Sequence, residues 1–260
     1  MRVGAPLLTA SLLLVLCTGR SAALCMSTAT RIERARTDEQ LRAAASAFAN
    51  AFWGEQHTSL DASLARLHYA DMEERYGELV GTRRLSSTLL LARDQVGAIL
   101  GLAGCELAVV DMPKRSVLSR KRGEALFKEG LSAMGARQRN ELRKAPLSEL
   151  ARALLPAGAQ VMPVLSNLAV LPAGRRKGLG RMLCNEIEAV ASGWIDAGAE
   201  STQLLLQVEA QNSPARSLYN SLGFSELWTN ENAAASQIVD GELITGTTTL
   251  ITMGKELGKN

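Results

Sequence analysis

Cysteine is scarce in this chain, and its few occurrences exclude two kinds of protein. Of four cysteines in 260 residues, Cys17 and Cys25 lie near the N-terminus, which leaves Cys105 and Cys184 for the rest. Two cysteines cannot form a disulfide framework, and no C-x-x-C or Cys/His spacing typical of a zinc site occurs. The N-x-[ST] sequon is absent as well. A disulfide-rich scaffold and a structural zinc protein are therefore excluded.

Net charge is also lacking once the first residues are set aside. The formal charge is +3, and residues 1–32 contain Arg2, Arg20 and Arg31 but no acid. The remaining 228 residues hold 26 basic and 26 acidic side chains. A general polyanion binder would be basic throughout, so that class is excluded. A hydrophobic content of 47% likewise excludes a disordered chain.

Residues 1–30 have the composition of a targeting segment. Arg2 precedes an apolar run over 5–17, which is shorter than the ~20 residues that span a bilayer. Small residues and then an acid-free, hydroxyl-rich stretch follow, as in organelle transit peptides. This two-part pattern predicts delivery to a plastid; a plain secretory signal is the alternative, and the missing sequon and few cysteines disfavour it. No stable membrane association is expected after processing.

After residue 30 the hydrophobic pattern predicts a single α/β domain with a mixed sheet over 31–258. Helix 178–197 has apolar residues at spacings of three and four, which places them on one face. Ser213 and Pro214 are predicted to be the N-cap and first-turn proline of another helix, which ends at Gly223. The other predicted helices cover 38–53 and 58–80, and the predicted strands are 31–37, 87–93, 97–111, 159–171, 202–209, 224–228 and 247–253.

A basic insertion at about 111–160 interrupts this pattern. Between 111 and 150 there are ten Lys/Arg and five Asp/Glu, a net charge of +5. The stretch is interpreted as an acceptor-side lid, a surface for ribosomal RNA or an acidic protein, or a solvated helical excursion. Phe127 is its only aromatic residue, so stacking on single-stranded nucleic acid is not expected.

A glycine turn with four basic residues follows the predicted strand 159–171. Glycines at the start of a helix let backbone N–H groups surround phosphate oxygens, and the helix dipole adds positive charge there. The turn is interpreted as a pyrophosphate site, although a merely structural basic helix start is the alternative. The Walker pattern G-x4-G-K-[ST] does not fit, because neither Gly174 nor Gly178 supplies it, and G-x-G-x-x-G does not fit because position 183 is leucine. The residues concerned are Arg175, Arg176, Lys177, Gly178, Gly180 and Arg181.

The blocks NLAVLPAGRRKGLGRML and LLLQVEAQNSPARSLYNSLGF resemble the GNAT superfamily of acyl-CoA N-acetyltransferases. Arg175, Gly178 and Gly180 match its [QR]-x-x-G-x-[GA] signature, and Asn212, Tyr219 and Gly223-Phe224 match its downstream pattern. The resemblance implies the GNAT fold, an α/β (α+β) arrangement of a mixed, mostly antiparallel central sheet that splays at the acetyl-CoA strand and is flanked by helices. It also implies acetyl-CoA as co-substrate and no metal.

By the same resemblance, each matched residue has an implied role. Leu168, Ala169 and Val170 would bind the pantetheine arm as an added strand. Tyr219 would protonate the leaving thiolate as general acid and contact the cofactor. Asn212 would reach the cofactor arm. The pyrophosphate would be held by Arg175, Arg176, Lys177, Gly178, Leu179, Gly180 and Arg181.

The general base and the acceptor are less constrained. Relatives often have Glu or His where this chain has Gln207, so either water or Glu209 would take the amine proton. Plastid-type relatives acetylate protein N-termini and internal lysines, which makes protein and peptide amines the first acceptors expected. A small-molecule amine acetyltransferase for arylalkylamines or polyamines, and a non-catalytic acyl-CoA-binding module, are the alternatives. His57 and His68 could line an acceptor cleft, although surface or packing roles are favoured.

Overall fold

A mixed eight-stranded sheet organises the part of the chain that the computed structural model describes, namely residues 30–54, 61–77, 85–196, 199, 201–239 and 242–258. Only β5 and β6 pair in parallel among these strands. The strand order is β1-β2-β3-β5-β6-β8-β7, with β4 on β3. Their bounds are β1 Arg31–Arg34, β2 Ser87–Arg93, β3 Ile99–Asp111, β4 Ser116–Val117, β5 Ala159–Val170, β6 Gln203–Glu209, β7 Ser225–Val239 and β8 Glu242–Glu256.

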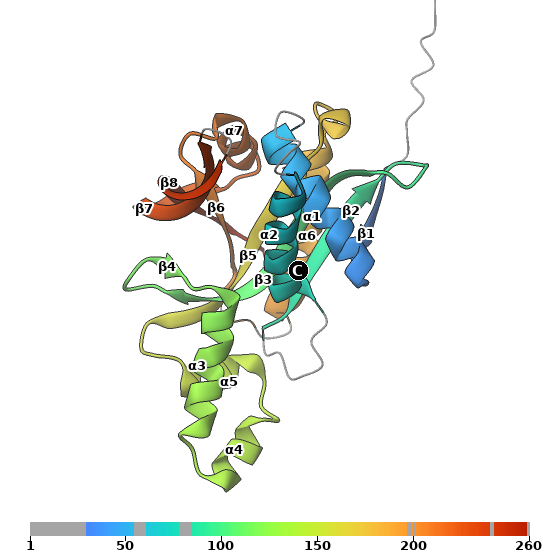
Figure 1. Ribbon diagram of the computed structural model, residues 1–260. Helices are drawn as coiled ribbons and strands as arrows, with labels where there is room; N and C mark the ends of the chain where they lie inside the picture. Colours follow the sequence, from blue (N-terminus) through green and yellow to red (C-terminus); the bar gives the residue numbers. More distant parts are fainter. Residues whose placement is uncertain are drawn as a thin grey trace, which may run out of the picture.

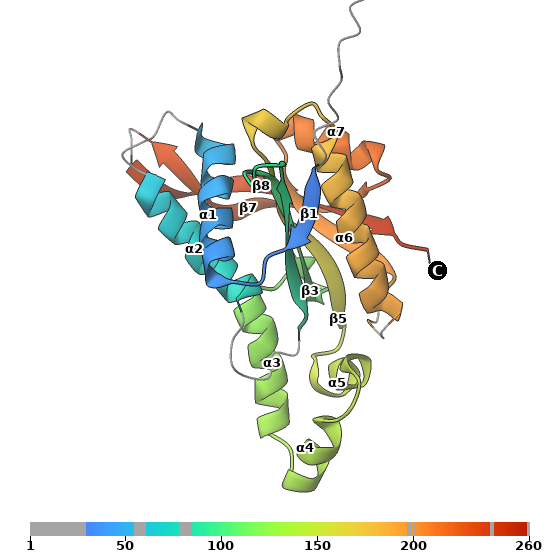
Figure 2. The same ribbon diagram turned by 90° about the vertical axis from the view of Figure 1, so that its right-hand side faces the viewer.

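Helices cover both faces of the sheet (Figures 1 and 2). Helices α1, Asp38–Trp53, and α2, Asp61–Tyr76, lie on one face and pack on β2, β3 and β5. Helices α6, Leu179–Asp196, and α7, Ser213–Ser221, contribute to the core on the other face. The predicted apolar stripe of α6 is confirmed, since Leu179, Leu183 and Ile187 are buried there. Each sheet face therefore has its own hydrophobic core.

Local sequence signals begin and end several of these helices. Thr37 is the N-cap of α1, and its hydroxyl accepts a hydrogen bond from the backbone N–H of Gln40. The Gln40 side-chain oxygen in turn accepts one from the backbone N–H of Thr37. Helix α7 ends before Gly223, whose φ of 89° suits glycine, as predicted. Its N-cap, however, is Asn212 and not the predicted Ser213. The Asn212 side-chain oxygen accepts a hydrogen bond from Ala215 N at 3.2 Å. The prediction was displaced by one residue, because the Ser-Pro pair is itself a common helix start.

Strands β5 and β6 separate along their length. Only Val164↔Leu205 and Leu165↔Leu206 are paired, although β5 continues to Val170 and β6 to Glu209. A bulge in β5 accompanies the separation, because the pairing with β3 shifts between Leu102 and Gly104, and Asn167 has a φ of 51°. The predicted splay of the sheet is therefore present. This opening between β5 and β6 is called the splay below.

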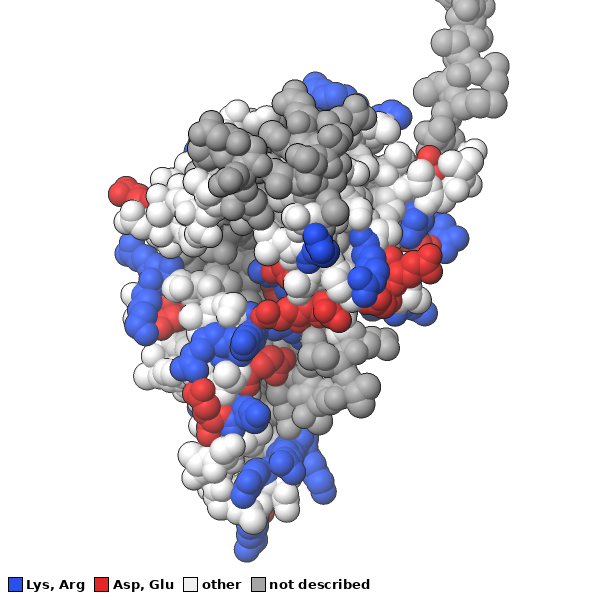
Figure 3. Space-filling view, in the orientation of Figure 1, with Lys and Arg blue, Asp and Glu red and all other residues white. Residues whose placement is uncertain are grey.

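The basic insertion forms a separate lobe of β4 and three helices at one end of the sheet (Figure 1). Phe127 and Leu150 are buried against Leu107 and Val109 of β3, so the lobe packs on the end of the sheet through a hydrophobic cluster of its own. Lys and Arg side chains gather over its far end, with acidic ones among them (Figure 3). Its helices are α3 Arg120–Ser132, α4 Ala136–Leu142 and α5 Leu147–Leu154.

One expectation needs correction, and two others lie outside the described residues. The last two strands are much longer than predicted and form one hairpin, because cross-strand pairing extends over a polar, threonine-rich stretch with little hydrophobic pattern. The targeting segment lies outside the described residues, apart from residue 30, and so does His57. No helix among the described residues is long and apolar enough to cross a membrane.

Candidate functional site at the splay

The turn between β5 and α6 exposes a series of backbone donors. A short 3-10 helix, Pro172–Gly174, ends β5 and redirects the chain. Arg176 and Gly178 then have φ values of 61° and 76°. Within the described residues, no hydrogen bond uses the backbone N–H groups of residues 176–181. Such consecutive N–H groups at the start of an 18-residue helix make a concave anion site, which the helix dipole reinforces.

The basic side chains of the turn have different surroundings. Arg176 and Lys177 are exposed, and neither has an ion pair within the described residues. Arg181 donates from Nη2 to Ser221 Oγ at 2.7 Å, which joins α6 to α7. Arg175 donates to Val170 O at 3.1 Å and to Ala51 O at 3.0 Å. Arg175 therefore braces the turn against the end of α1, whereas Arg176 and Lys177 leave their charges available to an anion.

The predicted pantetheine strand lies along the splay. Leu168 and Val170 pack on the α6 side of the sheet, and Ala169 packs on the α1 side. Beyond Leu165 this segment has no strand partner on the β6 side among the described residues, although β3 still pairs with its other edge. An extended ligand could add itself to such an edge through backbone hydrogen bonds.

Tyr219 and Asn212, which the sequence places near the cofactor, come from α7 and its cap. Tyr219 is 5% exposed and packs edge-on to Phe224, with ring centroids 5.9 Å apart. Burial, assisted by the neighbouring Cys184 thiol, raises the pKa of Tyr219 above its usual range. The hydroxyl thus stays protonated at neutral pH, as an acid must. The Asn212 side-chain oxygen accepts the hydrogen bond of the helix cap, and its amide nitrogen could donate to a ligand.

Glu209 and Gln207 lie on the opposite face of the sheet from Tyr219. In β6, Leu204, Leu206 and Val208 enter the core beneath α6, so the alternate residues point toward the α1/α2 side. Gln207 is exposed and donates to Thr252 Oγ1 at 3.4 Å. Glu209 accepts from Gln211 Nε2 at 3.1 Å. At the splay, the tyrosine hydroxyl therefore lies on the α6 side of the sheet, and the amide and carboxylate of β6 lie on the α1/α2 side.

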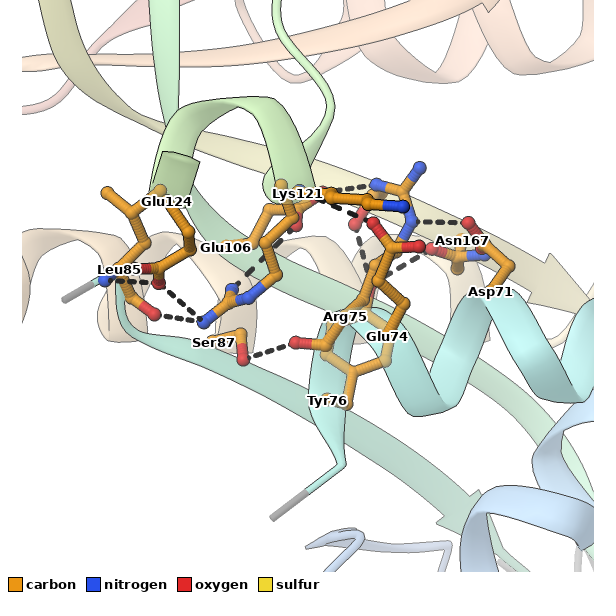
Figure 4. A network of polar contacts seen from close by, with 12 residues as sticks. Asp71, Glu74, Arg75, Tyr76, Leu85, Ser87, Glu106, Lys121, Glu124 and Asn167 are labelled. Atoms are coloured by element: carbon orange, nitrogen blue, oxygen red, sulfur yellow. Dashed lines mark hydrogen bonds and ion pairs between the residues drawn. The ribbon is translucent and has the colours of Figure 1, made fainter. Parts of the chain in front are cut away.

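A buried charged network beside the splay was not predicted (Figure 4). Glu106 of β3 pairs with Arg75 of α2 and lies 3.9 Å from Arg120 of α3, and its side chain is 5% exposed. Burial raises the pKa of Glu106, and the two arginines oppose that rise. The sequence signal was a single acid in an otherwise apolar strand, which needs cationic partners if it is buried.

Tyr76, the last residue of α2, was also missed. Its hydroxyl lies 2.7 Å from Ser166 Oγ and donates to Asn167 Oδ1 at 2.9 Å, at the bulge in β5. The ring passes over Gly104, where a Cβ would come within 1.9 Å of the Tyr76 oxygen. Only glycine at position 104 permits this contact.

His68 has a packing environment. Its ring stacks on Trp53 with centroids 4.9 Å apart and meets Phe48 at 4.8 Å. Burial lowers the pKa of His68, which favours the neutral ring. Among the described residues, no group of three or more His, Cys, Asp or Glu side chains could hold a metal ion.

A family model and solved structures are similar to this chain. Residues 147–233, which include β5, the turn and α7, match the family model described as FR47-like protein. A protein of the GNAT family from Desulfovibrio desulfuricans superposes with a TM-score of 0.50 at 14% identity, covering 88% of this chain and all of its own (100%). This chain has the GNAT acetyltransferase fold. No curated sequence matches it.

Two further solved structures match this chain with lower TM-scores. The ribosomal-protein-S18-alanine N-acetyltransferase of Escherichia coli has a TM-score of 0.46 and 19% identity, covering 89% of this chain and 97% of its own. A Salmonella typhimurium protein solved with its cofactor acetyl-CoA has a TM-score of 0.41 and 17% identity, with 89% and 95% coverage. At such identities a likeness shows the fold alone, so the function must be argued from the site.

Proposed function

We propose that this protein is an N-acetyltransferase that moves acetyl from acetyl-CoA directly to a primary amine, with protein N-terminal α-amines and lysine ε-amines as its acceptors. The observation that carries the proposal is the splay, which combines an unpaired strand edge with a turn of six uncommitted N–H groups. An extended amide arm that ends in a pyrophosphate fits these two features together. Acetyl-CoA is a ligand of that kind.

Residues on the two faces of the sheet have different roles in cofactor binding and proton transfer. Residues 176–181 hold the pyrophosphate with N–H groups and basic side chains, and Leu168 to Val170 align the arm. Acetyl-CoA supplies a thioester whose carbonyl carbon an amine attacks. Tyr219, buried and protonated, gives its proton to the departing sulfur. Glu209, on the α1/α2 side, or water takes the proton that the amine loses.

The acceptor class is tested by an acetylome. The protein and its Tyr219→Phe variant are expressed in a bacterium, and acetylated N-termini and lysines are quantified by mass spectrometry. We expect many new protein sites with the native chain and few with the variant. If no protein site changes while purified protein acetylates arylalkylamines or polyamines, the acceptor is a small amine. Binding of acetyl-CoA without turnover of any amine would instead indicate a non-catalytic acyl-CoA-binding module.

Gly178 offers a direct test of the pyrophosphate turn. Gly178→Val is expected to weaken acetyl-CoA binding at least tenfold, because a β-branched residue disfavours a φ of 76° and its side chain obstructs the anion. Isothermal titration with acetyl-CoA measures the effect.

Gly193→Ala in α6 is the matched control for the turn substitution. A Cβ at that position has no neighbour within 4 Å, so binding should not change. Equal affinity of the Gly178→Val variant and the native protein would contradict a pyrophosphate role for this turn.

Delivery to a plastid stays a prediction from residues 1–30. A fluorescent protein fused behind these residues should enter plastids in a plant or algal cell. Retention in the secretory pathway would support the plain signal peptide instead.

A further inference from the structure

A pair of polar residues faces the α1/α2 side of the splay, one on each strand. Val164 and Leu205, the last residues of their register on that face, are 5% and 0% exposed and share one hydrophobic cluster. Residues two positions further on a strand point the same way. Ser166 and Gln207 therefore flank the opening where the strands part, and Ser166 is half-buried while Gln207 is exposed.

Tyr76 of α2 contacts Ser166 through its hydroxyl group. Its hydroxyl is 2.7 Å from Ser166 Oγ and 2.9 Å from Asn167 Oδ1. Burial, and then the charge of Glu106, raises the pKa of Tyr76 above its usual range, so the phenol keeps its proton. The contact also secures Asn167, whose left-handed φ of 51° creates the bulge.

The contact with Tyr76 determines whether the Ser166 hydroxyl can donate or accept a further hydrogen bond. A tyrosine hydroxyl has one proton, and Tyr76 gives it to the carbonyl oxygen of Asn167, which can only accept. Because the Tyr76 proton goes to the side-chain oxygen Oδ1 of Asn167, the 2.7 Å contact requires Ser166 to donate its own proton to the Tyr76 oxygen. Ser166 is left with acceptor lone pairs and no proton to offer. It therefore presents a fixed hydrogen-bond acceptor at the splay.

We propose that Ser166 is a positioning residue for the acceptor amine, and that its oxygen accepts a hydrogen bond from an N–H of the incoming nitrogen. This inference rests on the proposed acetyl transfer. Holding the amine by an N–H leaves the nitrogen lone pair free to attack the thioester carbon. The new C–N bond forms as the C–S bond breaks, the sulfur receives the electron pair and the Tyr219 proton, and the amine's surplus proton leaves to Glu209 or water.

The two faces of the sheet support this arrangement. Tyr219 packs in the core beneath α6, together with Leu206 and Val208 of β6. Ser166 is bonded to α2 on the other face. An amine held by Ser166 thus approaches the thioester from the side opposite to the group that protonates the sulfur. The amine therefore does not compete with Tyr219 for space at the thioester.

The test compares Ser166→Ala, Tyr76→Phe and the double variant by steady-state kinetics with a peptide amine and acetyl-CoA. Each single change is expected to lower kcat/KM for the amine about tenfold, the effect of one lost hydrogen bond, with KM for acetyl-CoA within about twofold. The double variant should be no slower than the worse single variant, because Tyr76 acts on the amine only through the Ser166 hydroxyl that it orients. Ser166→Thr, which keeps the hydroxyl, should restore most of the rate.

Two matched controls separate this role from general damage. Tyr69→Phe removes a hydroxyl of α2 that bonds Asp38 at the surface, and Ser132→Ala removes one that bonds Lys128 O at 2.8 Å in α3. Both should keep the native rate. An unchanged rate in Ser166→Ala, or additive losses in the double variant, would overturn the positioning role. A native protein that acetylates no amine would refute the proposed function itself.

Discussion

Tyr219→Phe is expected to lower kcat by about 100-fold, a common contribution of a general acid, while KM for acetyl-CoA changes little. The phenyl ring keeps the packing against Phe224, so only the proton donor is lost. Burial already raises the pKa of Tyr219, and the native protein should show no loss of rate from tyrosine ionisation below about pH 10. The deficit of the variant should consequently be the same at all pH values between about 7 and 9.

Steady-state kinetics over that pH range, with thermal unfolding of both proteins, decides the matter. A variant that unfolds like the native protein but turns over 100-fold more slowly supports the acid role. If Tyr219→Phe turns over at the native rate, the leaving sulfur departs without this proton. In that case the tyrosine contributes only its ring to the core beneath α6.

Arg120→Met is expected to lower the free energy of unfolding by about 3 kcal/mol, because it removes one cation from a buried carboxylate. The side chains of Arg120 and Glu106 are only 3% and 5% exposed. Arg120 also donates to Leu85 O, and Leu85 N donates to Glu124 at 3.0 Å, so the start of α3 is tied to the segment just before β2 (Figure 4). Losing this arginine weakens the attachment of the whole lobe.

The loss should depend on pH in a defined direction. Burial raises the pKa of Glu106 and Arg120 opposes the rise, so the variant's Glu106 has a still higher pKa. A carboxyl with a raised folded pKa stabilises the fold when protonated, and that contribution is lost as pH rises through the folded pKa. The deficit of Arg120→Met should therefore be larger at about pH 8 than at about pH 5.

Urea unfolding at these two pH values measures the deficit. Arg122→Met is the matched control in the same helix, since Arg122 and its partner Glu129 are 54% and 60% exposed. That exposed pair should contribute less than about 1 kcal/mol. An equal, small loss in both variants would mean that the Glu106 network does not hold the lobe. Adding Glu106→Gln to Arg120→Met should restore part of the stability at the higher pH.

Much of the architecture followed from periodicity and turn chemistry. Helix 38–53 and strand 87–93 have the predicted bounds, because a capping box and an apolar run are read within a few residues. Gly178 and Gly223, which the sequence placed in a turn and at a helix end, both have positive φ values. The long hairpin of β7 and β8 did not follow, because its stability comes from cross-strand pairing between residues with little hydrophobic pattern of their own.

The sequence by itself determined the glycine turn before α6 and the α6 stripe, because each depends on residues close together in the chain, and its motifs indicated the class of fold. Only the tertiary structure decided which face of the splay a residue serves. Register and the bulge at Asn167 send Ser166 toward α2, where it meets Tyr76 from 90 residues away. Likewise the packing of α1 gave Arg175 a carbonyl partner, Ala51 O, from 124 residues away. Contacts between segments so far apart depend on how the whole chain packs, which no local pattern encodes.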